Sequence, residues 1–274
     1  MAGGRAAIHR LLCTIPGSFS LRSLEDDPRM RKIQVSLVPE ALEPDSDGIC
    51  AVVDVIRACT TLLTIAETSN SDIYVASSLQ AAREAADKLG PGTLLCGERG
   101  GVAPDGFDHG NSPLEFQHVE PPERCFVLST TNGAFAIEHW SSARRTFIGT
   151  LRNAGAVAQR LLDEHNSGVI TIVCAGRDGT LALDDVYTAG VIVRRLSDAD
   201  PRLELDETAL LALHSVDGYP SAIEALANSQ SAQLLKQVGL FSDVAYCAKV
   251  DTSTVVPELS PDGQLHIWPR SNGS

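Results

Sequence analysis

Acidic and basic side chains follow several short apolar runs of the sequence, either directly or in the loop that comes next. The carboxylates placed in this way are Asp54, Glu98, Asp108, Asp184 and Asp185. Mg²⁺ prefers hard oxygen ligands of this kind. Arg57, Arg99 and Arg177 lie beside them, and their forked N–H donors suit phosphate, sulfonate or carboxylate oxygens. These residue types predict a site for a small anion and a divalent metal.

Hydroxyl and amide groups near the same positions could bind the oxygens of that anion. They are Thr60, Thr61, Asn111, Ser112, Thr130, Thr131 and Asn132, together with the backbone of Gly133. The run from Thr130 to Gly133 precedes a predicted helix, and the N-terminus of a helix offers free N–H groups to anions. The same run could therefore bind a phosphate group.

Each of these pieces also has a purely structural alternative. Asp54, Thr130 and Asn132 could cap the helices that follow them. Glu98 and Arg99 could form a surface ion pair of little energetic value. The adjacent Asp184 and Asp185 could complement the dipole of a helix. It is the coincidence of all these residues at strand ends that favours a common site.

The elements that must position these residues alternate between strands and helices. Strands are predicted over residues 33–38, 49–55, 72–76, 93–96, 125–129, 146–149, 169–174, 244–248 and 265–267. Helices are predicted over 60–67, 79–89, 133–139, 154–164 and 183–196, followed by mostly helical sequence to residue 237. This alternation predicts an α/β fold with a largely parallel or mixed central sheet that is covered on both faces. Ligands of such sheets bind beyond the carboxyl ends of the strands.

The sequence predicts one domain preceded by an N-terminal extension. A single catalytic α/β domain is predicted over residues 30–270, and residues 1–29 are predicted to be a disordered extension, with a transit peptide as the alternative. The Gly- and Pro-rich stretch 97–113 has no periodicity, and a loop of this length inside a domain is usually functional or disordered. No stretch approaches the roughly 20 apolar residues that span a bilayer.

Charge and cysteine content restrict the partners. The chain has 22 Lys and Arg residues against 35 Asp and Glu residues, a net charge of −13. Such a chain would repel nucleic acid and anionic membranes, because proteins bind these polyanions through basic residues. A small anionic substrate is not excluded.

The seven cysteines show no CxxC pair. They therefore predict reduced thiols in a cytoplasmic protein, without disulfides or a zinc site.

Taken together, the motifs resemble the 2-phosphosulfolactate phosphatase family. The matching segments are 53–61, 97–101 (GERGG), 106–113 (GFDHGNSP), 130–133 (TTNG), 174–176 with Asp184–Asp185, 189–190, and scattered positions over 239–257. They follow the order of the family over about residues 31–257. The combination of GERGG, GFDxGNSP and TTNG is specific, whereas each alone is weak.

The resemblance implies a three-layer α/β/α domain and Mg²⁺-dependent hydrolysis of the phosphate monoester of a 2-hydroxy acid. The best-known substrate is (2R)-2-phospho-3-sulfolactate, which gives 3-sulfolactate and phosphate; in methane-producing archaea this step belongs to coenzyme M biosynthesis. The chain departs from the family at Phe135, where an arginine is common, and at Asp184, where a glutamate is usual. His109 stands where an apolar residue is common, and Arg177 has no counterpart that we can match.

We expect Asp54, with one or more of Glu98, Asp108, Asp184 and Asp185, to hold Mg²⁺. The nucleophile is left open between a metal-activated water, Asp54 itself and Cys174. Two other functions stay open: a hydrolase or lyase acting on another phosphorylated hydroxy acid, and a non-catalytic anion-binding relative, which the loss of arginine at Phe135 would favour. A homodimer is compatible with the sequence.

Overall fold

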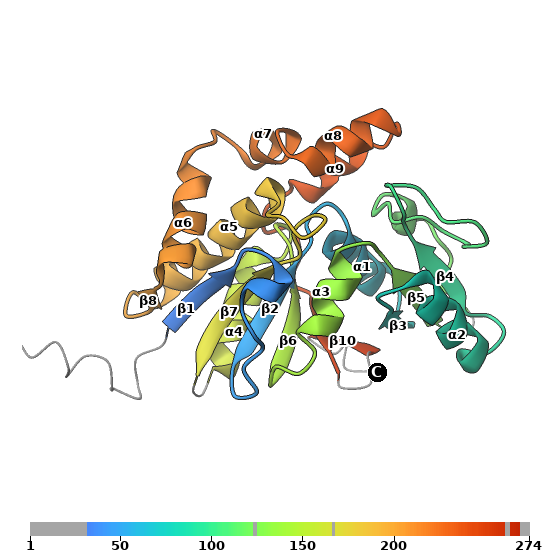
Figure 1. The fold of residues 1–274 in the computed structure, drawn as a ribbon, viewed down its shortest axis with the longest axis horizontal. Helices are drawn as coiled ribbons and strands as arrows, with labels where there is room; N and C mark the ends of the chain where they lie inside the picture. The colour runs from blue at the N-terminus through green and yellow to red at the C-terminus, as the bar shows by residue number, and fades with distance from the viewer. Residues whose placement is uncertain (1–31, 123–124, 166–167, 261–263, 269–274) are drawn as a thin grey trace, which may run out of the picture.

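The computed structural model of the chain describes residues 32–122, 125–165, 168–260 and 264–268 (Figure 1). The strands within these ranges are β1 Lys32–Ser36, β2 Ile49–Val53, β3 Asp72–Val75, β4 Leu94–Gly97, β5 Cys125–Ser129, β6 Arg145–Gly149, β7 Val169–Cys174, β8 Glu204–Leu205, β9 Val256–Leu259 and β10 Gln264–Trp268. The helices are α1 Ala58–Thr68, α2 Leu79–Leu89, α3 Gly133–His139, α4 Ala154–Glu164, α5 Leu183–Ala199, α6 Glu207–Asp217, α7 Ala222–Ala227, α8 Gln230–Gln237 and α9 Ser242–Cys247, with 3₁₀ turns at Pro39–Ala41 and Glu115–Gln117. The extension predicted over residues 1–29 lies outside the described residues.

All the strands join one mixed sheet in the order β4-β5-β3-β10-β9-β6-β2-β7-β1-β8. β4, β5 and β3 form one parallel group, and β6, β2, β7, β1 and β8 form another. The hairpin of β9 and β10 lies between the groups and pairs antiparallel with both. Because three antiparallel pairings follow one another, the two parallel groups run in opposite directions.

Helices cover both faces of the sheet, which confirms the predicted three-layer α/β fold. On one face, Ala51 and Val53 of β2 pack in a core with Val157 of α4 and Ile192 of α5. On the other, the alternate residues Cys50 and Val52 pack with α1 and α3. Every residue of β2 is buried, as expected for a central strand that is covered on both sides.

The predicted elements largely agree with the structure. The predictions for α2, α3, α4, β5 and β7 are correct to the residue. α2 begins where Ser78 accepts a hydrogen bond from the backbone N–H of Ala81, a typical N-cap. Among the described residues, no helix is long and apolar enough to cross a membrane. The six cysteines that the structure describes are free thiols, as predicted, and Cys13 lies outside the described residues.

The C-terminal part contains one wrong prediction and two omissions, the short strand β8 and the strand β9. Residues 244–248 are not a strand; they belong largely to α9, which packs against α7 and α8 and buries Val244 and Tyr246. β9 has no counterpart among the predicted strands, and it contains Pro257, which has no N–H to donate to a neighbouring strand. The register explains why proline is tolerated: Pro257 is paired with Ile267 of β10, while the pairing with β6 includes only Glu258 and Leu259.

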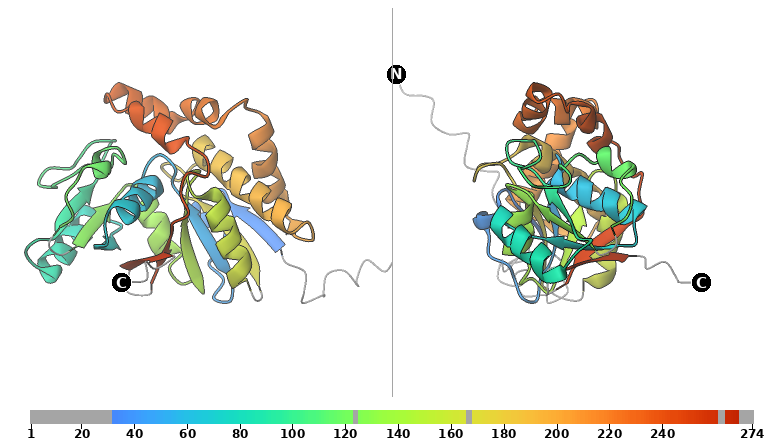
Figure 2. Two further views of the ribbon diagram at one scale, coloured as in Figure 1. Left: turned by 180° about the vertical axis from the view of Figure 1, so that it is seen from behind. Right: turned by 90° about the vertical axis from the view of Figure 1, so that its right-hand side faces the viewer.

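The helices from α6 to α9 form an arm beside the sheet (Figures 1 and 2). α6 packs against α5, and the chain then continues through α7 and α8 toward the carboxyl ends of the strands. Residues Ser231, Leu234 and Leu235 of α8 reach the pocket that also contains Asp54, which follows β2. α8 therefore helps to enclose the site.

Candidate active site

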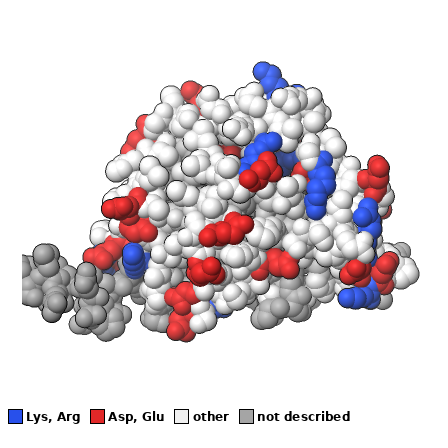
Figure 3. All heavy atoms as spheres, viewed as in Figure 1, with Lys and Arg blue, Asp and Glu red and all other residues white. Residues whose placement is uncertain are grey.

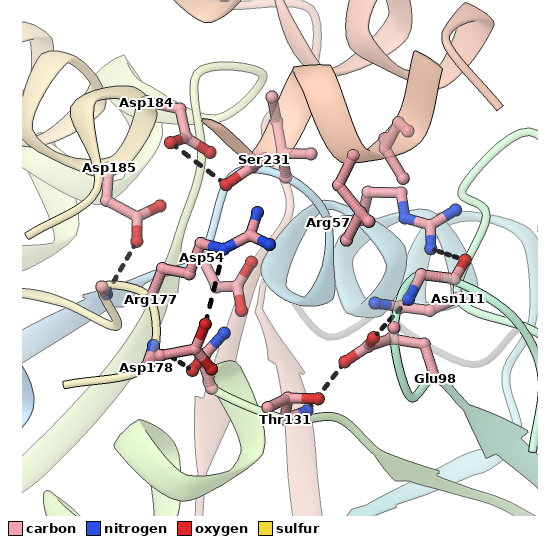
Figure 4. Close-up of a pocket in the computed structure, with 17 residues that line it drawn as sticks. Asp54, Arg57, Glu98, Asn111, Thr131, Arg177, Asp178, Asp184, Asp185 and Ser231 are labelled. Carbon is pink, nitrogen blue, oxygen red and sulfur yellow. Dashed lines mark hydrogen bonds and ion pairs between the residues drawn. The ribbon is translucent and has the colours of Figure 1, made fainter. Parts of the chain in front are cut away.

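A polar pocket lies where the two parallel groups of strands meet (Figure 4). One wall, which we call the first wall, comes from the segments after β2 and β7 and from the start of α5. The second wall comes from the segments after β4 and β5. The pocket is lined by Asp54, Ile56, Arg57, Glu98, Gly100, Gly101, Asn111, Thr131, Asn132, Gly176, Arg177, Asp178, Asp184, Asp185, Ser231, Leu234 and Leu235. The predicted convergence of strand-end residues is therefore present, but from two groups of strands and not from one edge of a parallel sheet.

Asp54 follows β2 and is largely buried in the first wall. Its Oδ1 accepts a hydrogen bond from the N–H of Ala58 (3.2 Å), so the capping alternative accounts for one oxygen only. No donor among the described residues contacts Oδ2. Burial raises the pKa of Asp54 to about 7, and the charges of Asp184 and Glu98 add to the effect. Asp54 thus presents one uncommitted oxygen beside other acidic groups.

Gly133 makes this arrangement sterically possible. A Cβ atom at this position would lie 2.5 Å from Asp54 Oδ2 and 2.6 Å from the Cβ of Ala58. Both distances are far below van der Waals contact. Gly133 therefore allows α3 to pack closely against Asp54. Gly133 itself does not line the pocket.

Asp184 and Asp185 begin α5 and have different surroundings. Both oxygens of Asp185 accept backbone N–H bonds, from Val55 and from Gly176 (3.0 Å each), which links the ends of β2 and β7. Asp184 is held by a longer contact from the hydroxyl of Ser231 (3.4 Å). Burial raises the pKa of Asp184 to about 6, and burial together with the neighbouring Asp184 raises the pKa of Asp185.

Glu98 links parts of the second wall. Its Oε2 accepts the N–H of Gly101 (3.0 Å) and its Oε1 accepts the N–H of Thr131 (2.8 Å). Glu98 therefore fixes the positions of the segments after β4 and β5. Asp108 lies elsewhere: it is exposed, accepts the N–H of Leu95 (2.8 Å), and does not line the pocket.

The three arginines differ in how far their guanidinium groups are already used. Arg57 is buried, and it donates to Asp243 Oδ2 (2.8 Å) and to the carbonyl of Gly101 (2.7 Å). Arg99 donates to the carbonyl of Glu98 and does not line the pocket. Arg177 lines the pocket and pairs only loosely with its neighbour Asp178, at 3.6 Å.

Figure 3 shows the charged groups on the surface that faces the viewer in Figure 1. Acidic groups are spread across this surface, whereas basic groups are concentrated in its upper and right-hand parts.

The predicted hydroxyl and amide residues separate into two sets. Asn111, Thr131 and Asn132 line the pocket. Asn111 is buried, and its Oδ1 has no hydrogen-bond partner among the described residues. Asn132 Oδ1 accepts the N–H of Asp178 (3.1 Å), which connects the two walls.

The second set supports the loops instead of lining the pocket. Thr60 donates to the carbonyl of Val55, Thr61 to the carbonyl of Asn111, and Ser112 to Asp243. Thr130 Oγ1 accepts the N–H of Ala134 and so caps the start of α3, as the structural alternative proposed.

Two further positions bear on the open questions. Cys174 is fully buried at the end of β7 and does not line the pocket; burial and the charges of Asp185 and Asp184 raise its pKa, which disfavours a thiolate. Phe135, the position where the family commonly has arginine, is exposed on α3 and stacks on His139. Phe135 does not line the pocket.

The sequence did not point to the pocket residues contributed by α8. Ser231, Leu234 and Leu235 come from an ordinary amphipathic helix far along the chain, and no local pattern marks them. Asp178 lies in the turn after β7, and its position directly after a strand-end arginine could have identified it.

Comparisons with known proteins identify the family to which the chain belongs. The family model described as 2-phosphosulpholactate phosphatase matches residues 36–262. A protein of Deinococcus radiodurans named "probable 2-phosphosulfolactate phosphatase" is 39% identical over 231 residues, which are 84% of this chain and 94% of that protein. A protein of Thermus thermophilus with the same name is 38% identical over 83% of this chain and 94% of its own length. The chain therefore belongs to the 2-phosphosulpholactate phosphatase family.

Proposed function

We propose that this protein hydrolyses the phosphate monoester of a 2-hydroxy acid, with (2R)-2-phospho-3-sulfolactate as the substrate and 3-sulfolactate and phosphate as the products. Membership of the family and the names of its relatives support the phosphatase chemistry and this substrate. The observation that carries the assignment is the presence of polar oxygens that have no hydrogen-bond partner among the described residues. Asp54 Oδ2 and Asn111 Oδ1 both fall in this class, and both residues line the pocket.

The pocket also suits Mg²⁺. Glu98 and Asp185 use both carboxylate oxygens on backbone N–H groups, whereas Asp54 has a free oxygen and Asp184 contacts the hydroxyls of serines at the start of α8. Among the described residues, no three His, Cys, Asp or Glu side chains form a complete metal site. Mg²⁺ commonly takes one or two carboxylates and completes its shell with water and substrate phosphate oxygens. We therefore assign the metal to Asp54 and Asp184, and its chemistry would be to polarise the phosphoryl group.

The rest of the pocket is suited to hold the substrate in place. Thr131 and Asn132 border the start of α3, and Asn111 presents a buried amide. These groups would orient the phosphate against Asp54 without adding charge. The nucleophile is either water or Asp54 Oδ2, and the buried thiol of Cys174 is not proposed for this role.

Phosphate release from 2-phospho-3-sulfolactate tests this function, first with Mg²⁺ and then with EDTA. We expect release that depends on the metal and that is lost in Asp54→Asn. Asp87→Asn, which removes an exposed carboxylate on α2, is the matched control and should retain full activity. Folded protein that releases no phosphate in either condition would refute the proposal.

Two extensions of the assay address the open alternatives. Acid quenching during turnover would trap phosphoprotein if Asp54 attacks the phosphorus, and none if water does. A panel of other 2-phospho-hydroxy acids, including 2-phospholactate, would reveal a preference for a substrate without sulfonate.

A further inference from the structure

Of the two arginines that line the pocket, Arg177 makes fewer hydrogen bonds and ion pairs with other residues. Arg57 also lines the pocket, but its side chain is only 2% exposed and its Nη atoms bond Asp243 and Gly101. The Arg177 side chain is 27% exposed, and its ion pair with Asp178 involves Nε at 3.6 Å. The charge of Arg177 also acts on Asp184, where it opposes the rise in pKa that burial causes, but no hydrogen bond from its Nη groups to a carboxylate is found among the described residues.

The backbone that carries Arg177 is well fixed. Arg177 and Thr180 exchange two backbone hydrogen bonds (2.8 and 2.9 Å), which close a tight turn after β7. Gly176 at the base of the turn has φ +66°, and a Cβ there would lie 2.5 Å from the carbonyl oxygen of Thr180. Asp185 holds the N–H of Gly176, and Asn132 holds the N–H of Asp178. A fixed backbone with a free cationic end is the arrangement expected of a group that awaits an anion.

Arg177 also lies between the pocket and a second hollow. A second hollow lies next to the pocket, between the segment after Arg177 and the start of α8. The two hollows share Arg177, Asp184 and Ser231 as lining residues. Figure 4 shows Arg177 between the Asp184–Asp185 side of the pocket and Asp178. Arg177 thus lies at the junction, away from the Glu98 and Asn111 end.

We propose that Arg177 binds the sulfonate of the substrate and determines the preference for a sulfonated over an unsulfonated 2-phospho-hydroxy acid. This inference rests on the proposed function. A sulfonate keeps its negative charge at every physiological pH and presents three oxygens, which match the forked donors of a guanidinium. Because its sulfur lies one bond farther from the phosphorus than the carboxylate carbon does, the sulfonate reaches farthest from the reacting group held near Asp54.

Steady-state kinetics with two substrates tests the inference. In Arg177→Gln we expect kcat/KM for 2-phospho-3-sulfolactate to fall about 30-fold and kcat/KM for 2-phospholactate to change less than about threefold. Arg177→Lys keeps the charge but loses the fork, and it should recover only part of the preference. Arg202→Gln removes an arginine that is 87% exposed and paired with Asp200, and it should leave both values unchanged. Thermal unfolding of each variant checks that it is folded.

Binding of the reaction products gives a second readout that needs no turnover. Calorimetry should give a Kd for 3-sulfolactate that rises about 30-fold in Arg177→Gln, with no comparable change for lactate. If kcat/KM in Arg177→Gln falls by the same factor for both substrates, the inference is wrong. It is also wrong if kcat/KM falls for neither substrate. If the wild-type protein releases no phosphate, the proposed function fails, but binding of 3-sulfolactate that depends on Arg177 would still support the inference. Absence of such binding would overturn it.

Discussion

The two walls of the pocket differ in the kind of group that they contribute. The first wall carries buried charge: Asp54 and Asp184, each with a raised pKa, and the guanidinium of Arg177. The second wall contributes the amide side chains of Asn111 and Asn132. Its one carboxylate, Glu98, already accepts hydrogen bonds from two N–H groups. The comparison teaches that charged groups and neutral polar groups come from different strand groups, which under the proposed function separates the reaction chemistry from the positioning of the substrate. The predictions below test each wall and the contact between them.

The largest effect should come from the first wall. Asp54→Asn keeps the cap to Ala58 but removes the charge of the free oxygen. We expect kcat/KM to fall by about 10³-fold, because this oxygen either holds the metal or attacks the phosphorus. Phosphate release at saturating Mg²⁺ measures it, with Asp87→Asn as the control. Activity within a few-fold of wild type would show that the first wall does not carry the chemistry.

The contact between the walls can be broken at Gly133. In Gly133→Ala the new methyl group would meet Asp54 Oδ2 and Ala58, so α3 must move away from Asp54. We expect a loss of about 2 kcal/mol in the free energy of unfolding and about a 100-fold loss in kcat/KM. Urea unfolding and phosphate release measure the two effects. Gly218→Ala, where the nearest atom is 3.3 Å from the added Cβ, should change neither value much.

The raised pKa values of the first wall predict how stability depends on pH without metal. Asp54 and Asp184 shift from 3.8 in the unfolded chain to about 7 and about 6 in the folded protein. The folded state therefore binds more protons between these values, and stability is lost as the pH rises through about 4 to 7. In EDTA we expect the free energy of unfolding to be lower at pH 8 than at pH 5 by about 4 kcal/mol.

Two controls separate this effect from the overall negative charge. Asp54→Asn should flatten the dependence on pH, and Mg²⁺ should restore stability more at pH 8 than at pH 5. Equal stability at both pH values in EDTA would contradict the prediction.

A change in the second wall should have the smallest effect. Glu98→Gln keeps the size of the side chain but replaces one acceptor oxygen with an NH₂ group, which faces an N–H donor. We expect KM to rise about tenfold while kcat changes less, because the loop loses one hydrogen bond and no reacting group. Glu43→Gln, at an exposed position, is the control. A loss in kcat as large as that of Asp54→Asn would place Glu98 in the chemistry and remove the difference between the walls.

Much of the fold was predictable because its signals are local. The apolar run that became β2 and the Ala-rich segment that became α2 are defined by their own residues. α9 and β9 were not predictable in this way, because the neighbours of Val244 and Pro257 decide their conformation. The same distinction holds in the site. Asp54, Glu98 and Asn111 could be found from strand ends and motifs, whereas the full use of Arg57 by Asp243 and Gly101 depends on contacts between distant segments.

The hairpin of β9 and β10 has a consequence for how the molecule is assembled during synthesis. These are the last strands of the described chain, yet they lie in the middle of the sheet and join groups that are made much earlier. As the chain leaves the ribosome, each parallel group can begin to form by itself, since domains and their parts fold as they emerge. The sheet becomes continuous only when the hairpin arrives. We therefore expect nascent chains that end before Val256 to be inactive and prone to association through their unpaired edges β3 and β6.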